Sequence, residues 1–292
     1  MTFPITVCAR IFTAEDLEMI RSIIQMDDTN RAQISREVCR RLGWLKPDGG
    51  LKEMSCRVAL LKLHRLALIE LPPPRNRNGN GANHIEFTAA SNPDNPIAEG
   101  LSTLGPIELV RVIQRKQSRF WNELIQRHHY LAYTPLPGAQ IRYLIYNKTG
   151  ILLGAIGFSA SAWAVRPRDN YIGWTKEHRI SRLHLVVNNS RFLILPWVQV
   201  KNLASKVLSQ CAKQLPNDWQ TSYGYTPVLL ETFVEKERFA GTCYKASNWC
   251  HVGQTQGRGK LDRKKECKLP VKDIYLYPLS KKFREILTWP DY

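Results

Sequence analysis

The sequence predicts an α+β fold in two parts, a small helical module followed by a larger domain built on one mixed sheet. Three observations predict this class. Three segments before residue 67 have apolar residues at helical spacing, and the stretch over residues 72–105 is rich in Pro, Asn and Gly. Beyond it, apolar strand-like runs alternate with helical segments. We therefore expect domains at residues 1–75 and 106–292, joined by a linker at residues 76–105.

The amino-terminal module is predicted from two capped helices and a third, basic helix. Thr13 is a suitable cap for a helix over residues 13–26, and Asn30 for a second helix that stops at Gly43. The third helix follows a Pro-Asp-Gly-Gly turn and is predicted by Met54, Val58, Leu61 and Leu66. Residues 68–71 then have the character of a short strand.

Helix, helix, turn, basic helix and strand is the order of a winged helix-turn-helix domain. Between Arg31 and Arg75 the module has ten Lys or Arg against four Asp or Glu, a net charge of +6. The basic side chains of the candidate recognition helix are Lys52, Arg57, Lys62 and Arg65. Such side chains contact phosphates, which gives affinity without sequence information. The alternative is a helical bundle with a solvated basic face.

The larger domain is predicted from helices and strands that follow one another along the chain. Residues 107–133 predict a helix in two pieces, and two apolar runs around Asn147–Gly150 predict a hairpin. The later elements are a strand or strand pair at 179–196 with turn-prone Asn188 and Asn189, a helix at 200–216 ending at Pro216, and strands at 227–234 and 274–279. One mixed sheet with helices packed on it accounts for this order.

The charge of the chain predicts a polyanionic partner. Its 292 residues have a formal net charge of +17, yet 43% are hydrophobic, so a normal core forms and the excess charge lies on the surface. Nucleic acid is favoured over a membrane because no basic amphipathic anchor and no membrane-spanning apolar window is present. The amino terminus does not resemble a signal peptide, and the seven cysteines form no C-x-x-C pair. We expect a cytoplasmic protein.

Three residues are the candidates for catalysis. Glu231 stands inside the apolar run PVLLETFV, where a buried carboxylate needs a cation, a metal such as Mg²⁺ or Mn²⁺, or hydrogen-bond donors. It suits a general base, and the alternative is a structural ion pair, for example with Arg191. His128 and His129 end a helix, and because adjacent residues do not share a helical face we expect a role for one of them. Tyr130 beside them is suited to stack on a base.

Two further groups are candidates for binding nucleic acid. Asn188, Asn189 and Arg191 offer donors to a phosphate or base edge, although a turn stabilised by its own side chains fits equally. The second group is a glycine-rich basic loop near the carboxyl end, with Arg258, Lys260, Arg263 and Lys264. We hypothesise that this loop clamps a nucleic-acid backbone beside Tyr244 and Trp249. The alternative is that the charged loop is simply exposed to solvent and binds nothing.

Several long motifs stand in one order: HHYLAY, LLGAIGFSASAW, HLVVNNSRFLILPWVQVKNLASKVL, YGYTPVLLETFVEKERFAGTCYKASNW and GQTQGRGKLDRK. Over residues 120–279 they resemble the family named after the DruA component of Druantia anti-phage systems. This resemblance implies phage-defence or transposase-associated biology on DNA, with defence-system or transposase proteins as partners.

A second resemblance is architectural. The hairpin, the long strand leading into a helix at Val200 and the strand of Glu231 are similar in order to a GNAT acyltransferase. The segment PWVQVKNLASKVL lacks the glycines with which that family cradles a diphosphate, so the use of acetyl-CoA is doubtful.

The residues and the resemblances together predict a DNA-binding protein of the phage-defence or transposon-associated type. One alternative is a DNA-processing enzyme, acting by phosphodiester cleavage or strand transfer with Glu231 and a histidine, or by base modification on a GNAT-like scaffold. Another is a subunit of a defence complex that catalyses nothing.

Overall fold

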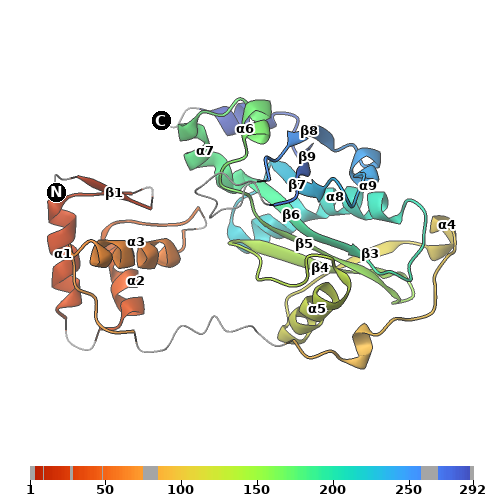
Figure 1. Cartoon of the computed structure of the whole chain (residues 1–292), viewed down its shortest axis with the longest axis horizontal. Helices are drawn as coiled ribbons and strands as arrows, with labels where there is room; N and C mark the ends of the chain where they lie inside the picture. The colour runs from red at the N-terminus through yellow and green to blue at the C-terminus, as the bar shows by residue number, and fades with distance from the viewer. Residues whose placement is uncertain are drawn as a thin grey trace. The chain divides into compact units, whose positions relative to one another are not determined.

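The computed structural model of the protein describes residues 4–8, 10–26, 29–47, 49–74, 85–257 and 269–289. The chain divides into two compact units, Met1–Asn83 and His84–Tyr292, each with a hydrophobic core of its own (Figure 1). Within the described ranges, no helix has both the length and the apolar character needed to cross a membrane.

The amino-terminal unit consists of a short hairpin and three helices. Its elements are β1 (Ile5–Val7), β2 (Arg10–Phe12), α1 (Ala14–Ile24), α2 (Arg31–Arg41) and α3 (Glu53–Arg65). Thr13 caps α1 and Asn30 caps α2, each through a capping box, which confirms both predicted helix starts. Leu17, Ile34 and Leu60, one from each helix, are fully or almost fully buried in the shared core.

The buried face of α3 is not the predicted one. Cys56, Ala59, Leu60 and Leu63 face the core, whereas Met54 is 68% exposed and Val58 46% exposed. Apolar residues lie on two different faces of α3, so either face could be buried. The face with the small side chains of Cys56 and Ala59 allows α2 to pack closely against α3. The strand expected at residues 68–71 is also wrong, because these residues form a bend without strand pairing.

The larger unit is built on one seven-stranded mixed sheet. Its strands are β3 (Ile107–Arg111), β4 (Gln140–Asn147), β5 (Leu152–Ala160), β6 (Val186–Ile194), β7 (Leu229–Glu235), β8 (Cys250–Gln254) and β9 (Lys272–Pro278). Their order is β3-β4-β5-β6-β7-β9-β8, and every neighbouring pair is antiparallel except β6 with β7. The predicted mixed sheet and the hairpin at Asn147–Gly150 are confirmed.

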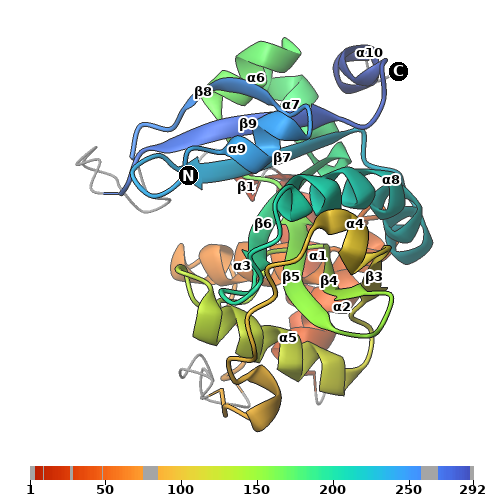
Figure 2. The same ribbon diagram turned by 90° about the vertical axis from the view of Figure 1, so that its right-hand side faces the viewer.

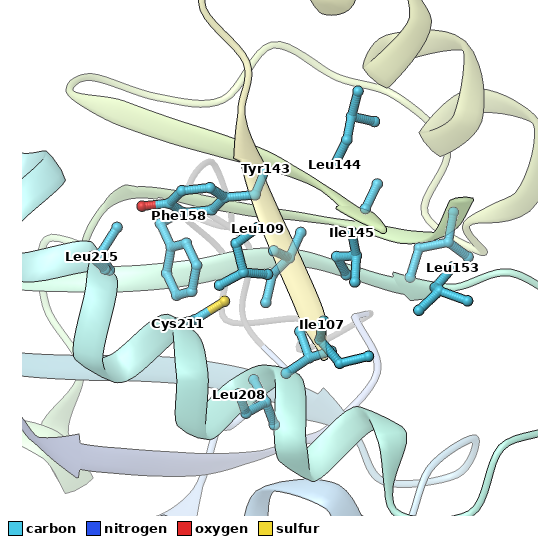
Figure 3. Packing of buried hydrophobic residues seen from close by; sticks show 14 of the residues in the cluster. Ile107, Leu109, Tyr143, Leu144, Ile145, Leu153, Phe158, Leu208, Cys211 and Leu215 are labelled. Carbon is cyan, nitrogen blue, oxygen red and sulfur yellow. The ribbon is translucent and has the colours of Figure 1, made fainter. Parts of the chain in front are cut away.

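Helices cover both faces of the sheet (Figure 2). They are α5 (Arg115–His128), α6 (Arg166–Ile172), α7 (Lys176–Arg182), α8 (Leu203–Tyr223), α9 (Thr242–Ala246) and α10 (Phe283–Thr288). Phe158 points toward Cys211 of α8 (Figure 3). Gly157, its neighbour in β5, faces Trp121 of α5, so α5 and α8 lie on opposite faces.

Three local predictions in this unit are wrong. Residues 107–111 form the edge strand β3 instead of a helix, since they pair with β4 along their whole length. Pro216 lies inside α8, which continues to Tyr223 because Trp219 beyond the proline is buried in the core. Asn188 and Asn189 lie within β6 and not in a turn.

Residues 85–105, expected to belong to the linker, pack onto the larger unit. They include η1 (Ala89–Ser91) and α4 (Leu101–Leu104). The buried carboxylate of Glu123 on α5 accepts hydrogen bonds from the hydroxyls of Thr88 and Ser91. Farther along, Ile97 forms a bridge with Val198 in the connection between β6 and α8. These contacts fasten the segment to α5 and to the end of β6.

Candidate functional site

The α3 face is the exposed side of α3 and carries the predicted nucleic-acid contacts of the amino-terminal unit. It comprises Met54, Arg57, Val58, Leu61, Lys62 and Arg65, and Lys52 is exposed at the start of the helix. Arg57 pairs with Glu53 one turn earlier. Lys62 and Arg65 have no ion-pair partner within the described part of the chain. As far as the described residues go, these two cations are unpaired, and they lie beside the exposed side chains of Met54 and Val58.

A pocket of about 530 Å³ opens in the larger unit where β6 and β7 separate. This β6–β7 pocket is lined by residues that include His129, Tyr130, Asn189, Thr232, Phe239 and Tyr244. The strands pair only from Val186 to Asn188 on β6. Beyond that point a bulge leaves Ser190 without a partner on β5, which turns the strand away from β7.

Hydrogen bonds hold the buried polar groups of the β6–β7 pocket in place. The Tyr244 hydroxyl donates to Asn189 Oδ1 at 2.8 Å, and Thr232 Oγ1 donates to the Asn189 carbonyl at 3.1 Å. Asn189 Nδ2 donates to the carbonyls of Gly157 and Arg191, both at 3.2 Å. Asn189 thus braces the bulge. Burial raises the pKa of Tyr244, which keeps its phenol protonated as a donor.

Aromatic side chains form the rim of the β6–β7 pocket. Tyr130 stacks on His129 with 4.9 Å between ring centroids and contacts Phe239 at 5.2 Å. The guanidinium of Arg238 lies 5.5 Å from the Tyr130 ring. Tyr130 is 37% exposed and Phe239 47% exposed. The rim therefore presents aromatic surface to solvent beside a cation.

His129 is a neutral imidazole at ordinary pH. Burial and, second, the Arg191 guanidinium lower its pKa from 6.5 to about 4. The Leu131 N–H donates to His129 Nδ1 at 3.2 Å, so the proton of the neutral ring is on Nε2. His128 differs, because its Nε2 lies 2.8 Å from the Ser91 carbonyl and its ring meets Trp197. One of the two histidines thus secures the 85–105 segment while the other presents an N–H group.

Glu231 is fully buried and engaged in a charge network. Its Oε2 accepts from Arg168 Nη1 at 2.8 Å, and its Oε1 accepts from the Ala162 N–H at 2.8 Å. Arg168 also pairs with Asp169 at 2.8 Å, which in turn pairs with Arg179 at 2.9 Å. The ion pair considered from the sequence exists, but the suggested cation was wrong. The Arg191 guanidinium instead bonds two backbone carbonyls and a threonine hydroxyl.

Within the described ranges, no group of three His, Cys, Asp or Glu residues is placed to hold a metal ion. In the connection between β6 and α8, the Gln199 N–H donates to the Ile97 carbonyl at 2.8 Å. The Val198 N–H donates to the Leu195 carbonyl at 2.9 Å. These two amides are not available to a diphosphate.

A family model described as Druantia protein DruA matches residues 62–265, which is more than half of the chain. The chain belongs to this DruA family.

Comparison with curated proteins finds no match. Among solved structures, a chimera of spermidine N-acetyltransferase SpeG from Vibrio cholerae with hSSAT is similar at 13% identity and a TM-score of 0.40, covering 61% of this chain and 98% of that one. The Vibrio cholerae enzyme in complex with CoA and spermine is similar at 14% identity and a TM-score of 0.38, with the same coverages. Both are acetyltransferases, the enzyme class of the architectural resemblance noted in the sequence, and the likeness is distant.

In this DruA-family chain, the predicted residues His128, His129, Asn189 and Tyr244 come together in the β6–β7 pocket. Glu231 does not line it, although it directly precedes Thr232 in β7. Trp249 is 4% exposed and packs against Tyr244, so neither ring offers a free outer face. The basic residues Arg258, Lys260, Arg263 and Lys264 lie outside the described residues.

Three residues of the DruA-family chain were missed from the sequence. Arg168 stands next to Asp169 in a short helix, and nothing local indicates that its side chain is buried. Arg238 and Phe239 follow β7 in a charged segment, EKERFAG, where a single aromatic residue among charges was the available signal. Their importance depends on tertiary contacts with β7 and with Tyr130.

Proposed function

We propose that this protein binds DNA as part of an anti-phage defence system, with the α3 face as its duplex-contacting surface. The observation that carries the proposal is that Lys62 and Arg65, which have no ion-pair partner among the described residues, lie beside exposed Met54 and Val58. Membership of the DruA family and the net charge of +17 support it. Other proteins of the defence system are the expected partners.

The amino-terminal unit acts, in this proposal, as a winged helix-turn-helix module. The second helix of such a pair lies in the major groove, where long cationic side chains reach phosphates and apolar side chains meet thymine methyl groups. Its counterpart here is α3, which follows α2 after a connection that includes Gly43 in the left-handed conformation, with φ +55°. Val58 and Met54 would then contact base edges while Lys62 and Arg65 hold the backbone.

Binding is favoured over strand cleavage by the state of Glu231. Both of its carboxylate oxygens accept hydrogen bonds from Arg168 and Ala162, and its side chain is fully buried. A carboxylate in this position would have to break an ion pair before it took a metal or a proton from a substrate. Cleavage with Glu231 therefore requires a rearrangement, whereas binding through α3 requires none.

The test is a titration of the full chain with labelled duplex and single-stranded DNA, with and without Mg²⁺ or Mn²⁺. We expect duplex binding that weakens steeply with salt, and intact DNA after incubation with either metal. Failure to bind DNA at low salt would overturn the proposal. Cleaved product in the presence of a metal would instead support the enzyme alternative.

A further inference from the structure

We propose that the β6–β7 pocket takes up one unpaired nucleobase of a nucleic-acid strand. The inference rests on the proposed function in one respect, that nucleic acid is the ligand of the chain. It adds a second contact in the larger unit, specific for a base that is not paired.

The first support is the aromatic rim. Tyr130 and Phe239 meet at 5.2 Å between ring centroids and remain 37% and 47% exposed. The pocket behind them, about 530 Å³, is lined by Phe192, Leu193 and other apolar side chains. A flat heteroaromatic ring can therefore stack on the rim and be covered by apolar walls. Stacking of this kind does not depend on which base is bound.

The second support is the set of hydrogen-bonding groups in the β6–β7 pocket. His129 presents an Nε2–H group because its Nδ1 is occupied by the Leu131 N–H. Base edges carry carbonyl and ring-nitrogen acceptors for such a donor. The imidazole is neutral, which suits a neutral base. No carboxylate is among the residues that line the pocket.

The third support is a cation beside the rim. The Arg238 guanidinium lies over the Tyr130 ring at 5.5 Å, and its Nε pairs with Glu235 at 2.8 Å. Its two terminal nitrogens have no hydrogen-bond partner among the described residues and can bind the phosphate next to the captured base. Cation, aromatic platform and enclosed apolar space are the combination found in single-strand binding sites.

An acyl-CoA molecule is the competing occupant of a cleft between diverging strands. Its diphosphate is held by backbone amides at and before the start of the following helix, and two of these, the amides of Gln199 and Val198 before α8, donate to Ile97 and Leu195. The 85–105 segment that supplies the Ile97 carbonyl is fastened to α5 through Glu123. Two amides before α8 are thus used by the chain itself, and competition with acetyl-CoA in the test below distinguishes the two occupants.

The test uses the full chain and two labelled oligonucleotides with the same backbone. One is abasic at every position, and the other carries a single 2-aminopurine. We expect the base-bearing strand to bind roughly 5- to 100-fold more tightly, the range that one stacked base supplies, and its fluorescence to be quenched. The variant Tyr130→Ala/Phe239→Ala should remove this ratio and the quenching. Thermal unfolding of this variant checks that it folds.

The matched control is Phe87→Ala, which removes an aromatic ring of the same unit that is 55% exposed and lies under Arg127, 5.4 Å from its guanidinium. This variant should keep the full ratio of affinities for the base-bearing and abasic strands. Equal affinity for the two strands, an equal loss in Phe87→Ala, or displacement of the base-bearing strand by acetyl-CoA would overturn the inference. If the protein binds duplex DNA but binds the base-bearing and abasic strands equally, this inference alone is contradicted. If it binds no nucleic acid at all, the proposed function is contradicted as well.

Discussion

Arg168 Nη1 and Glu231 Oε2 lie 2.8 Å apart, and neither side chain is exposed to solvent. Arg168 belongs to α6, which lies in the connection between β5 and β6, and Glu231 belongs to the interior strand β7. Asp169 and Arg179 extend the pair into α7. The network therefore ties α6 and α7 to the sheet, and its two positive charges balance its two negative charges.

Replacing Arg168 by Met should destabilise the protein by about 3–5 kcal/mol, because the Glu231 carboxylate would stay buried without its cation. Urea unfolding of the full chain measures the change. Arg238→Met is the control, since its ion pair with Glu235 involves a side chain that is 58% exposed and should cost at most about 1 kcal/mol. Equal stability of Arg168→Met and the wild-type protein would contradict the structural role of the pair.

His129 should titrate near pH 4 in the folded protein, since burial and Arg191 disfavour its charged form. The unfolded chain takes up this proton at the ordinary pKa of 6.5. The contribution of His129 to stability is therefore complete above pH 6.5 and is lost as the pH falls from about 6.5 to about 4. Ring resonances followed by NMR, assigned with His129→Gln, give the pKa. A midpoint at the ordinary value would show that the imidazole is solvated.

Gly157→Ala should destabilise the larger unit by roughly 1–3 kcal/mol through overpacking. An added Cβ would lie 2.8 Å from the ring of Trp121, which is fully buried on α5. Gly100→Ala is the control, because the nearest atom to its Cβ would be a serine hydroxyl at 3.6 Å. Thermal unfolding compares the two variants. Similar midpoints would mean that the packing of α5 on β5 tolerates the methyl group.

Elements with local signals were predicted from the sequence. The hairpin at Asn147–Gly150 is one, since Asn147 accepts hydrogen bonds from Thr149 and Ile151 within the turn itself. The capping boxes at Thr13 and Asn30 are others. In each case the stabilising contacts join residues within four positions of one another, so the pattern is visible in a short window.

Elements decided by tertiary contacts were not predicted. The edge strand β3 has apolar residues compatible with a helix, and only its pairing with β4 decides its form. The apolar spacing in α3 pointed to the face of Met54, but the helix has a second apolar face. Packing against α2 buries that second face and leaves Met54 exposed. At the candidate site, Glu231 was correctly placed in a buried strand, but its partner Arg168 is 63 positions away in the chain. Phe239 contacts Tyr130 across an even longer separation in the chain.

The salt dependence of duplex binding tests the central claim, that the α3 face grips DNA. We expect Lys62→Ala/Arg65→Ala to make the slope of log affinity against log salt shallower by about 2, one unit for each lost phosphate contact. The control Lys206→Ala/Lys213→Ala removes two exposed lysines from α8 with the same change in net charge, and should leave the slope unchanged. Equal slopes for both variants and the wild-type protein would contradict the assignment of α3 as the DNA-contacting helix.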